Sequence, residues 1–241
     1  MHESLAAPGV RQRTFRPAAD PLLDAAAFYD GGDGTDPTSP IVCMQHGGSS
    51  SKSGADVLDA ARVFVARGCR VLALDGPVHG ARGQDGETDL VTRERFLNLW
   101  RQAPGHIESH VNRWIDLLRE THEAWPDAHL LWYGVSMGTA YGLPVLAQAP
   151  RIRRAALGMW GACFPQSQRL LGDAGRVGCP VLFQQKWDDE LFTRQGQLDL
   201  FDALGTRDKR LVIYPGTHTR VVGEQLDDLV RFLCNEPGPG G

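Results

Sequence analysis

The sequence lacks the patterns that mark metal-binding, disulfide-linked, membrane-spanning and nucleic-acid-binding proteins. Its five cysteines are odd in number and scattered through apolar stretches, so we expect them to be reduced. No Cys-x-x-Cys pair and no His-Glu-x-x-His motif occurs, so no metal site is expected. No apolar run approaches the roughly 20 residues that cross a bilayer, and the net charge of -4 comes without a lysine or arginine run. Neither a membrane nor nucleic acid is therefore expected as a partner.

The chain also lacks a linker, an internal repeat and the pattern of a secretory signal. Its 241 residues, 42% hydrophobic and 22% charged, fit one globular domain that spans residues 1–241. The N-terminus has no basic start followed by an apolar run, so a cytoplasmic location is expected. Residues 236–241 are almost entirely glycine and proline and are expected to be disordered. The composition leaves the oligomeric state open.

Short apolar runs alternate with helical patterns along the chain. Strands are expected at 10–16, 22–29, 41–45, 70–74, 130–133, 155–159, 180–185 and 211–214. Helices are expected at 53–67, 92–124 with a break at Pro104, 136–148, 198–204 and 221–234. This alternation predicts an α/β fold, with a doubly wound, mostly parallel sheet of about eight strands and helices on both faces. In such folds ligands bind at the carboxyl ends of the strands, so the chemistry is expected in the loops that follow them.

A Gly-x-Ser-x-Gly motif, Gly134 to Gly138 with Ser136 at its centre, follows the strand at 130–133 and opens a helix. The bare motif is weak, with a chance of about one in ten in a chain of this composition. Its context is a strand-to-helix turn that lifts a serine hydroxyl above a sheet, and glycines suit the tight backbone there. We therefore identify Ser136 as the candidate nucleophile; the alternative is a serine that only caps the helix.

A serine hydroxyl needs a base and an acid that orients the base. His218 follows the last strand, on the same side of the sheet as the serine, and is the candidate base; the alternative is a histidine of a surface loop. The acid is expected between nucleophile and base in chain order, where three carboxylates are adjacent; by the pattern usual in enzymes of this kind Asp189 is the candidate, and Asp188 is the alternative. The oxyanion would be bound by the N–H groups of Met137 and of Gly48, with its neighbours Gly47 and Ser49 as alternatives to Gly48. Taken alone, that glycine pair fits a plain turn.

Together with the segment from Asp75 to Arg82, Asp-Gly-Pro-Val-His-Gly-Ala-Arg, these motifs resemble the α/β-hydrolase superfamily over about residues 41–234. The segment from Asp75 to Arg82 and the serine motif are most similar to the dienelactone hydrolase and prolyl oligopeptidase-like group of small bacterial serine esterases. The resemblance implies the α/β-hydrolase fold and acyl transfer through Ser136 without a cofactor. Two positions depart from it: Lys186 stands where such families usually have glycine, and Thr217 replaces the common glycine before the histidine.

The substrate is expected to lie between the strand ends and a helical cap. Residues 85–125 form an insert longer than a plain connection, and we expect a small cap there with an apolar acyl or aryl pocket. For part of this insert, packing on the sheet is the favoured alternative, because its apolar residues recur with helical period. The residues expected to line the substrate site are His46, Gly47, His79, Trp100, Trp160 and Trp187.

The favoured interpretation is a carboxylesterase for a small or medium ester. A thioesterase or acyltransferase would use the same three residues, so the expected partner is a small-molecule ester or thioester. A lyase, a cyclase or a binding protein built on the same fold is the alternative from a different class.

Overall fold

The computed structural model describes residues 3–7, 9–15, 26–32, 35–102, 105–149 and 151–234. Within these ranges nine strands form one sheet, in the order β1-β2-β3-β5-β4-β6-β7-β8-β9. The strands are β1 (Glu3–Ala7), β2 (Val10–Phe15), β3 (Ala26–Asp30), β4 (Ile41–Gln45), β5 (Arg70–Leu74), β6 (Leu130–Tyr133), β7 (Ile152–Gly158), β8 (Val181–Lys186) and β9 (Lys209–Tyr214). The tail at 236–241, expected to be disordered, lies outside the described residues, as does the start of the strand expected at 22–29.

The sheet is parallel from β5 and β4 through to β9, and antiparallel at the end formed by β1, β2 and β3. This confirms the mostly parallel α/β sheet. β2 and β3 are the expected opening antiparallel pair, and β1 adds one strand at the edge that the sequence pattern does not predict. Every residue of β4 and β5 is buried, because helices cover both faces of the central sheet.

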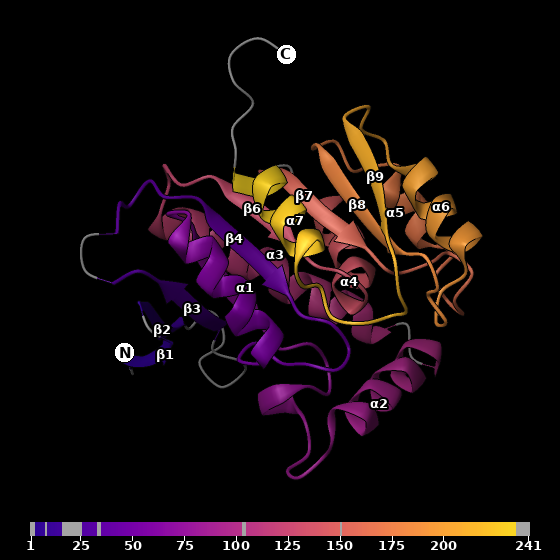
Figure 1. Ribbon diagram of the computed structural model, residues 1–241, viewed down its shortest axis with the longest axis horizontal. Coiled ribbons are helices and arrows are strands. Elements are labelled where there is room, and N and C mark those ends of the chain that lie inside the picture. Colours follow the sequence, from indigo (N-terminus) through magenta and orange to yellow (C-terminus); the bar gives the residue numbers. More distant parts are fainter. Residues whose placement is uncertain are drawn as a thin grey trace.

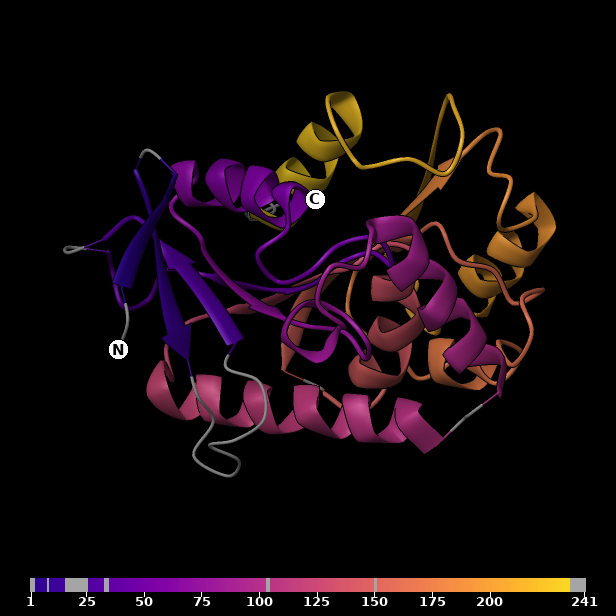
Figure 2. The same cartoon turned by 90° about the horizontal axis from the view of Figure 1, so that it is seen from below.

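The helices lie in two layers (Figures 1 and 2). α1 (Ala55–Ala66) and α7 (Glu224–Cys234) cover one face, and α3 (Gly105–Ala124), α4 (Met137–Leu146), α5 (Leu170–Ala174) and α6 (Arg194–Ala203) cover the other. Each layer encloses its own apolar core against the sheet. No helix in the described ranges is both long and apolar enough to cross a membrane.

The expected insert at 85–125 divides into two helices with different surroundings. α2 (Asp89–Gln102) lies beyond the carboxyl ends of the strands, after the short 3-10 helix η1 (Gly80–Arg82), as Figure 1 shows. α3 packs on the sheet face beside α4 and buries Val111, Trp114 and Leu118, as its helical period predicts. Only α2 is therefore positioned over the strand ends; its action as a cap stays a prediction.

Candidate active site

Ser136 occupies a sharp turn between β6 and α4. Its backbone has φ 57° and ψ -121°, a conformation that a non-glycine residue adopts only under strain. The turn is possible because Gly134 and Gly138 carry no side chain: a β-carbon on Gly134 would lie 2.7 Å from the oxygen of Gly138, and one on Gly138 would lie 2.5 Å from the oxygen of Gln45. The motif glycines thus let helix and strand approach closely enough to hold the serine above the sheet.

The structure brings Ser136, His218 and Asp189 into one chain of hydrogen bonds. Ser136 Oγ lies 3.0 Å from His218 Nε2, and His218 Nδ1 lies 3.0 Å from Asp189 Oδ2. The side chain of His218 is 9% exposed and that of Asp189 only 2%, so the ion pair that forms when the ring is protonated is shielded from water. This is the order of groups that activates a serine hydroxyl.

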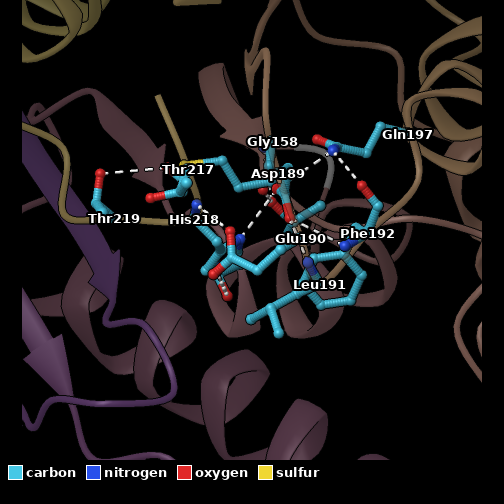
Figure 3. A network of polar contacts seen from close by, with 12 residues as sticks. Gly158, Asp189, Glu190, Leu191, Phe192, Gln197, Thr217, His218 and Thr219 are labelled. Carbon is cyan, nitrogen blue, oxygen red and sulfur yellow. Dashed lines mark hydrogen bonds and ion pairs between the residues drawn. The ribbon is translucent and has the colours of Figure 1, made fainter. Parts of the chain in front are cut away.

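Asp189 is itself held by three donors (Figure 3). Its Oδ1 accepts the backbone N–H groups of Leu191 and Phe192 at 3.0 and 2.9 Å, and its Oδ2 accepts Gln197 Nε2 at 3.3 Å as well as the histidine ring. Both carboxylate oxygens are therefore used, which fixes the plane of the carboxylate and through it the imidazole. No sequence pattern predicts the role of Gln197, because it reaches the acid from the next helix, α6.

The three consecutive acids 188–190 have three different surroundings. Asp188 is exposed and its N–H donates to the oxygen of Gly216 at 3.0 Å. Glu190 accepts the backbone N–H of His218 at 2.8 Å, and that hydrogen bond lowers the pKa of its carboxyl. Of the two aspartates considered from the sequence, Asp189 is the one whose carboxylate meets the histidine ring.

The two departures from the family pattern leave this geometry in place. Lys186 ends β8, and burial lowers the pKa of its ammonium. Directly after it, the N–H of Trp187 donates to the oxygen of Tyr214 at 2.8 Å, which ties the acid loop to the end of β9. Gly216, at φ 101°, supplies the turn two residues before His218.

Several backbone N–H groups near Ser136 are not used in hydrogen bonds within the described part of the protein. Among the described residues, the N–H groups of Met137, Gly48 and Ser49 have no protein acceptor. The oxygen of Gly48 accepts His79 Nε2 at 2.9 Å, and the oxygen of Gly47 lies 2.7 Å from His46 Nδ1. Since N–H and C=O of a trans peptide point in opposite directions, the N–H groups of Ser49 and Gly48 point away from these imidazoles.

His46 lies in this glycine loop, His79 contacts it from the segment 75–82, and both imidazoles are buried. His46 is 1% exposed; burial, reinforced by the charge of His79, lowers its pKa to about 3. Its Nε2 accepts the N–H of Gly76 at 2.9 Å, so its proton is on Nδ1, toward Gly47. His79 is fully buried, and burial lowers its pKa as well. Each ring thus contacts a backbone oxygen of the glycine loop, His46 that of Gly47 and His79 that of Gly48.

A buried ion pair anchors the far end of the same loop. Asp75, 1% exposed, accepts the N–H and the Nζ of Lys52 at 2.8 and 2.6 Å and the N–H of Ala81 at 3.0 Å. Burial raises the pKa of this carboxyl, but the hydrogen bonds and charge of Lys52 outweigh it and leave the pKa below its usual value. The segment from Asp75 to Arg82 thus positions the glycine loop of residues 46–52.

A cleft of about 1010 Å³ opens on Ser136 and His218. It is lined by the loop at 46–55, the residues around η1, the first turns of α2 and the segment 218–222. His46, Gly47 and Gly48 line it, whereas His79 lies behind Gly48. The lining mixes polar and apolar surface. Its polar side chains include Ser49, Ser50, Thr92, Arg93 and Thr219 and the carboxylates of Asp56, Asp59, Glu87 and Asp89.

The three tryptophans expected to line the substrate site lie elsewhere, which corrects that expectation. Trp100 and Trp160 are fully buried in an aromatic cluster, and the indole N–H of each donates to Ser167 Oγ, at 3.2 and 3.1 Å. Trp187 is 54% exposed, with the guanidinium of Arg194 3.9 Å above its ring, and does not line the cleft. A position near a strand end did not place these side chains in the cleft, because Trp100, on α2, and Trp160 pack against each other and against Ser167.

No protein-family model matches the chain, and no curated protein matches it. Among solved structures, a cold-adapted esterase from an Arctic intertidal metagenomic library, in complex with PEG, is 31% identical, covers 96% of each chain and superposes with a TM-score of 0.83. A dienelactone hydrolase from Anabaena variabilis is 16% identical over 93% of this chain and 95% of its own, with a TM-score of 0.67. An esterase from Pyrococcus furiosus is 14% identical over 94% and 93%, also with a TM-score of 0.67.

The last two similarities show the fold alone, whereas the first extends to the sequence over nearly the whole of both chains. On that similarity, and with the sheet and the serine turn described above, the chain belongs to the α/β-hydrolase superfamily.

Proposed function

We propose that the protein is a serine esterase in which Ser136 is the nucleophile, His218 the general base and Asp189 the acid that orients the base. The observation that carries the proposal is the unbroken hydrogen-bond chain from Ser136 Oγ through the imidazole to Asp189. The esterase named above, at 31% identity, supports the same class of reaction.

The reaction follows from the directions of these hydrogen bonds. As Ser136 Oγ attacks the carbonyl carbon of the ester, His218 Nε2 takes the hydroxyl proton and the ring becomes an imidazolium facing Asp189. Collapse of the tetrahedral intermediate releases the alcohol, which takes the proton back from Nε2, and leaves an acyl group on Ser136. Water then attacks the acyl-enzyme by the same route, with His218 again as base, and releases the acid.

The negative charge of the tetrahedral oxygen is stabilised by backbone donors. Met137 N–H, directly after the nucleophile, supplies one, and Gly48 or Ser49 N–H, in the loop that lines the cleft, supplies the second. His46 and His79 take no part in proton transfer in this scheme, because both ring nitrogens of each contact backbone groups. They position the loop that carries the second donor.

The cleft favours a small or medium ester with polar character over a long acyl chain. Its volume of about 1010 Å³ is in the range of sites that hold small molecules, and serine, threonine and arginine side chains reach into it. The aromatic cluster formed by Trp100 of α2 and Trp160 is fully buried and is closed to a substrate.

The test is hydrolysis of p-nitrophenyl acetate, butyrate and decanoate, together with an acyl pantetheine thioester, by the wild type and by Ser136→Ala. We expect turnover of the short oxygen esters, weaker turnover of the decanoate and thioester, and loss of all of it in Ser136→Ala. Thioester turnover that exceeds ester turnover would indicate a thioesterase instead of an esterase. Activity that persists in Ser136→Ala would show that Ser136 is not the nucleophile.

A further inference from the structure

Two cysteines that are 165 residues apart in the chain meet at the edge of the core on the α1 and α7 side of the sheet. The sulfurs of Cys69 and Cys234 are 3.1 Å apart, at hydrogen-bonding distance and as free thiols. No other two cysteine sulfurs are in contact among the described residues: Cys163, for example, accepts the hydroxyl of Thr193.

The backbone on both sides holds the two sulfurs in this arrangement. Cys69 completes the turn that ends α1: its N–H donates to the oxygen of Phe64 and the N–H of Gly68, at φ 78°, donates to Val65, each at 3.0 Å. β5 begins at the next residue. Cys234 is the last residue of α7, directly after Leu233, which is buried in the core. The sulfurs, 3.1 Å apart, are about 1 Å farther apart than in a disulfide bond.

We propose that Cys69 and Cys234 are a site of oxidative modification, at which a small hydroperoxide converts the two thiols into an intrachain disulfide that fixes the end of α7 to the start of β5. The Cys69 thiolate attacks one peroxide oxygen and the O–O bond breaks, which gives a sulfenic acid and, after protonation, water. The sulfur of Cys234 then attacks the Cys69 sulfur, and the hydroxyl leaves with the thiol proton as a second water. Two thiols and one hydrogen peroxide thus yield one disulfide and two waters, and the peroxide is reduced by two electrons.

The surroundings explain both the choice of thiolate and the choice of oxidant. The hydrogen bond from Cys234 lowers the pKa of the Cys69 thiol, although burial opposes it, and the nearby charge of Arg67 acts in the same direction as the hydrogen bond. Cys69 is only 3% exposed, so hydrogen peroxide reaches it more readily than a bulky disulfide such as oxidised glutathione.

The disulfide is expected to stabilise the fold and to leave the active site unchanged. α7 supports the last two strands, because Tyr214 donates to Asp228 at 2.7 Å and Gln184 donates to the oxygen of Gln225 at 2.8 Å. Closing so long a loop restricts the unfolded chain, and for a protein of this size the expected rise in Tm is roughly 5–10 °C. No residue of the pair lines the cleft at Ser136, so this inference is independent of the proposed esterase activity.

The experiment treats the wild type, Cys234→Ser and the control Cys163→Ser with hydrogen peroxide and, separately, with oxidised glutathione at neutral pH. Free thiols are then alkylated, disulfide-linked peptides are identified by mass spectrometry without reduction, and Tm is measured. We expect hydrogen peroxide to cause a mass loss of about 2 Da, a linked pair of peptides containing Cys69 and Cys234, and the rise in Tm, in both the wild type and Cys163→Ser. Cys234→Ser is expected to form sulfenic or sulfinic acid at Cys69 with no rise in Tm, and oxidised glutathione is expected to act more slowly.

Three results would overturn the proposal. The two thiols could remain alkylatable after peroxide has oxidised Cys163, or the linked peptides could contain a different pair of cysteines. An equal rise in Tm in Cys234→Ser would show that the stabilisation has another origin.

Discussion

Glu190 accepts the backbone N–H of His218 at 2.8 Å, on the same loop from which Asp189 contacts the ring of that histidine at 3.0 Å. Two consecutive carboxylates thus act on one residue in different ways: one orients the imidazole and the other fixes the main chain that carries it. The arrangement explains why an exposed glutamate belongs to the site although it touches neither the serine nor the cleft.

Replacing the buried acid is expected to be far more damaging than replacing its neighbour. Asp189→Asn keeps the size of the side chain but removes the charge opposite the imidazolium, and kcat on p-nitrophenyl acetate is expected to fall by about 10³- to 10⁴-fold. Asp188→Asn, the matched control, is expected to change kcat little because its side chain is exposed. Equal losses in the two variants would contradict the assignment of Asp189.

The contact between Glu190 and the main chain predicts a smaller effect that depends on the acceptor. Glu190→Ala removes the acceptor of the His218 N–H and is expected to lower kcat by about three- to tenfold. Glu190→Gln retains a carbonyl oxygen there and is expected to recover most of the activity. If glutamine proves as poor as alanine, charge rather than the hydrogen bond is what the site requires.

The position of His79 predicts an effect on the oxyanion-binding loop. His79→Ala removes the donor to the Gly48 oxygen, and kcat is expected to fall by about 10- to 100-fold with little change in KM. His79→Gln, whose amide can donate to the same oxygen, is expected to be less impaired, and exposed His129→Ala to match the wild type. A rise in KM with kcat unchanged would mean that His79 shapes substrate binding instead. Circular dichroism checks that each variant is folded.

The strands buried on both faces of the sheet were predictable from the sequence, and the edge strand β1 was not. The strands expected at 41–45, 70–74 and 130–133 have the observed bounds, because their runs of apolar residues fit only a covered central strand. β1 carries no such run, and α5 is a helix of five residues held by its neighbours rather than by a periodic pattern. Helix α1 begins after Gly54 with no side-chain cap, where the sequence favours Ser53.

The positions of Ser136, Asp189 and His218 could be predicted because each of them follows the end of a strand. The residues that line the cleft could not be predicted. β6, β8 and β9 are parallel and close together in the sheet, so the loops that follow them lie at the same, carboxyl-terminal end of the strands. A serine, an acid and a histidine in those loops are therefore expected to be near one another. Whether Trp100 faces that edge depends instead on how α2 packs on the loop that contains Ser167. Such a contact joins residues distant in sequence and leaves no pattern in it.

Buried neutral histidines predict a loss of stability in mild acid. Burial lowers the pKa of His46 to about 3, and burial, together with the charge of Arg82, lowers that of His110 well below its usual value. Below about pH 6.5 the unfolded chain therefore binds protons that the folded chain does not, and each such histidine lowers the free energy of unfolding by about 1.4 kcal/mol per pH unit.

Urea unfolding between pH 7 and pH 5.5 measures this slope. His110→Gln, whose amide can still donate to Gln45, is expected to reduce the slope, and His129→Gln, a change on the exposed surface, is the matched control. A free energy of unfolding that stays constant over this range would contradict the neutral state of the buried rings.

Covalent labelling shows directly whether Ser136 forms the acyl-enzyme. The wild type and Ser136→Ala are incubated with a fluorophosphonate, digested, and searched by mass spectrometry for the modified residue. We expect a single adduct, on Ser136, whose formation is abolished in Ser136→Ala and slowed in Asp189→Asn. A wild type that is not labelled while it hydrolyses esters, or an adduct on any other residue, would contradict it.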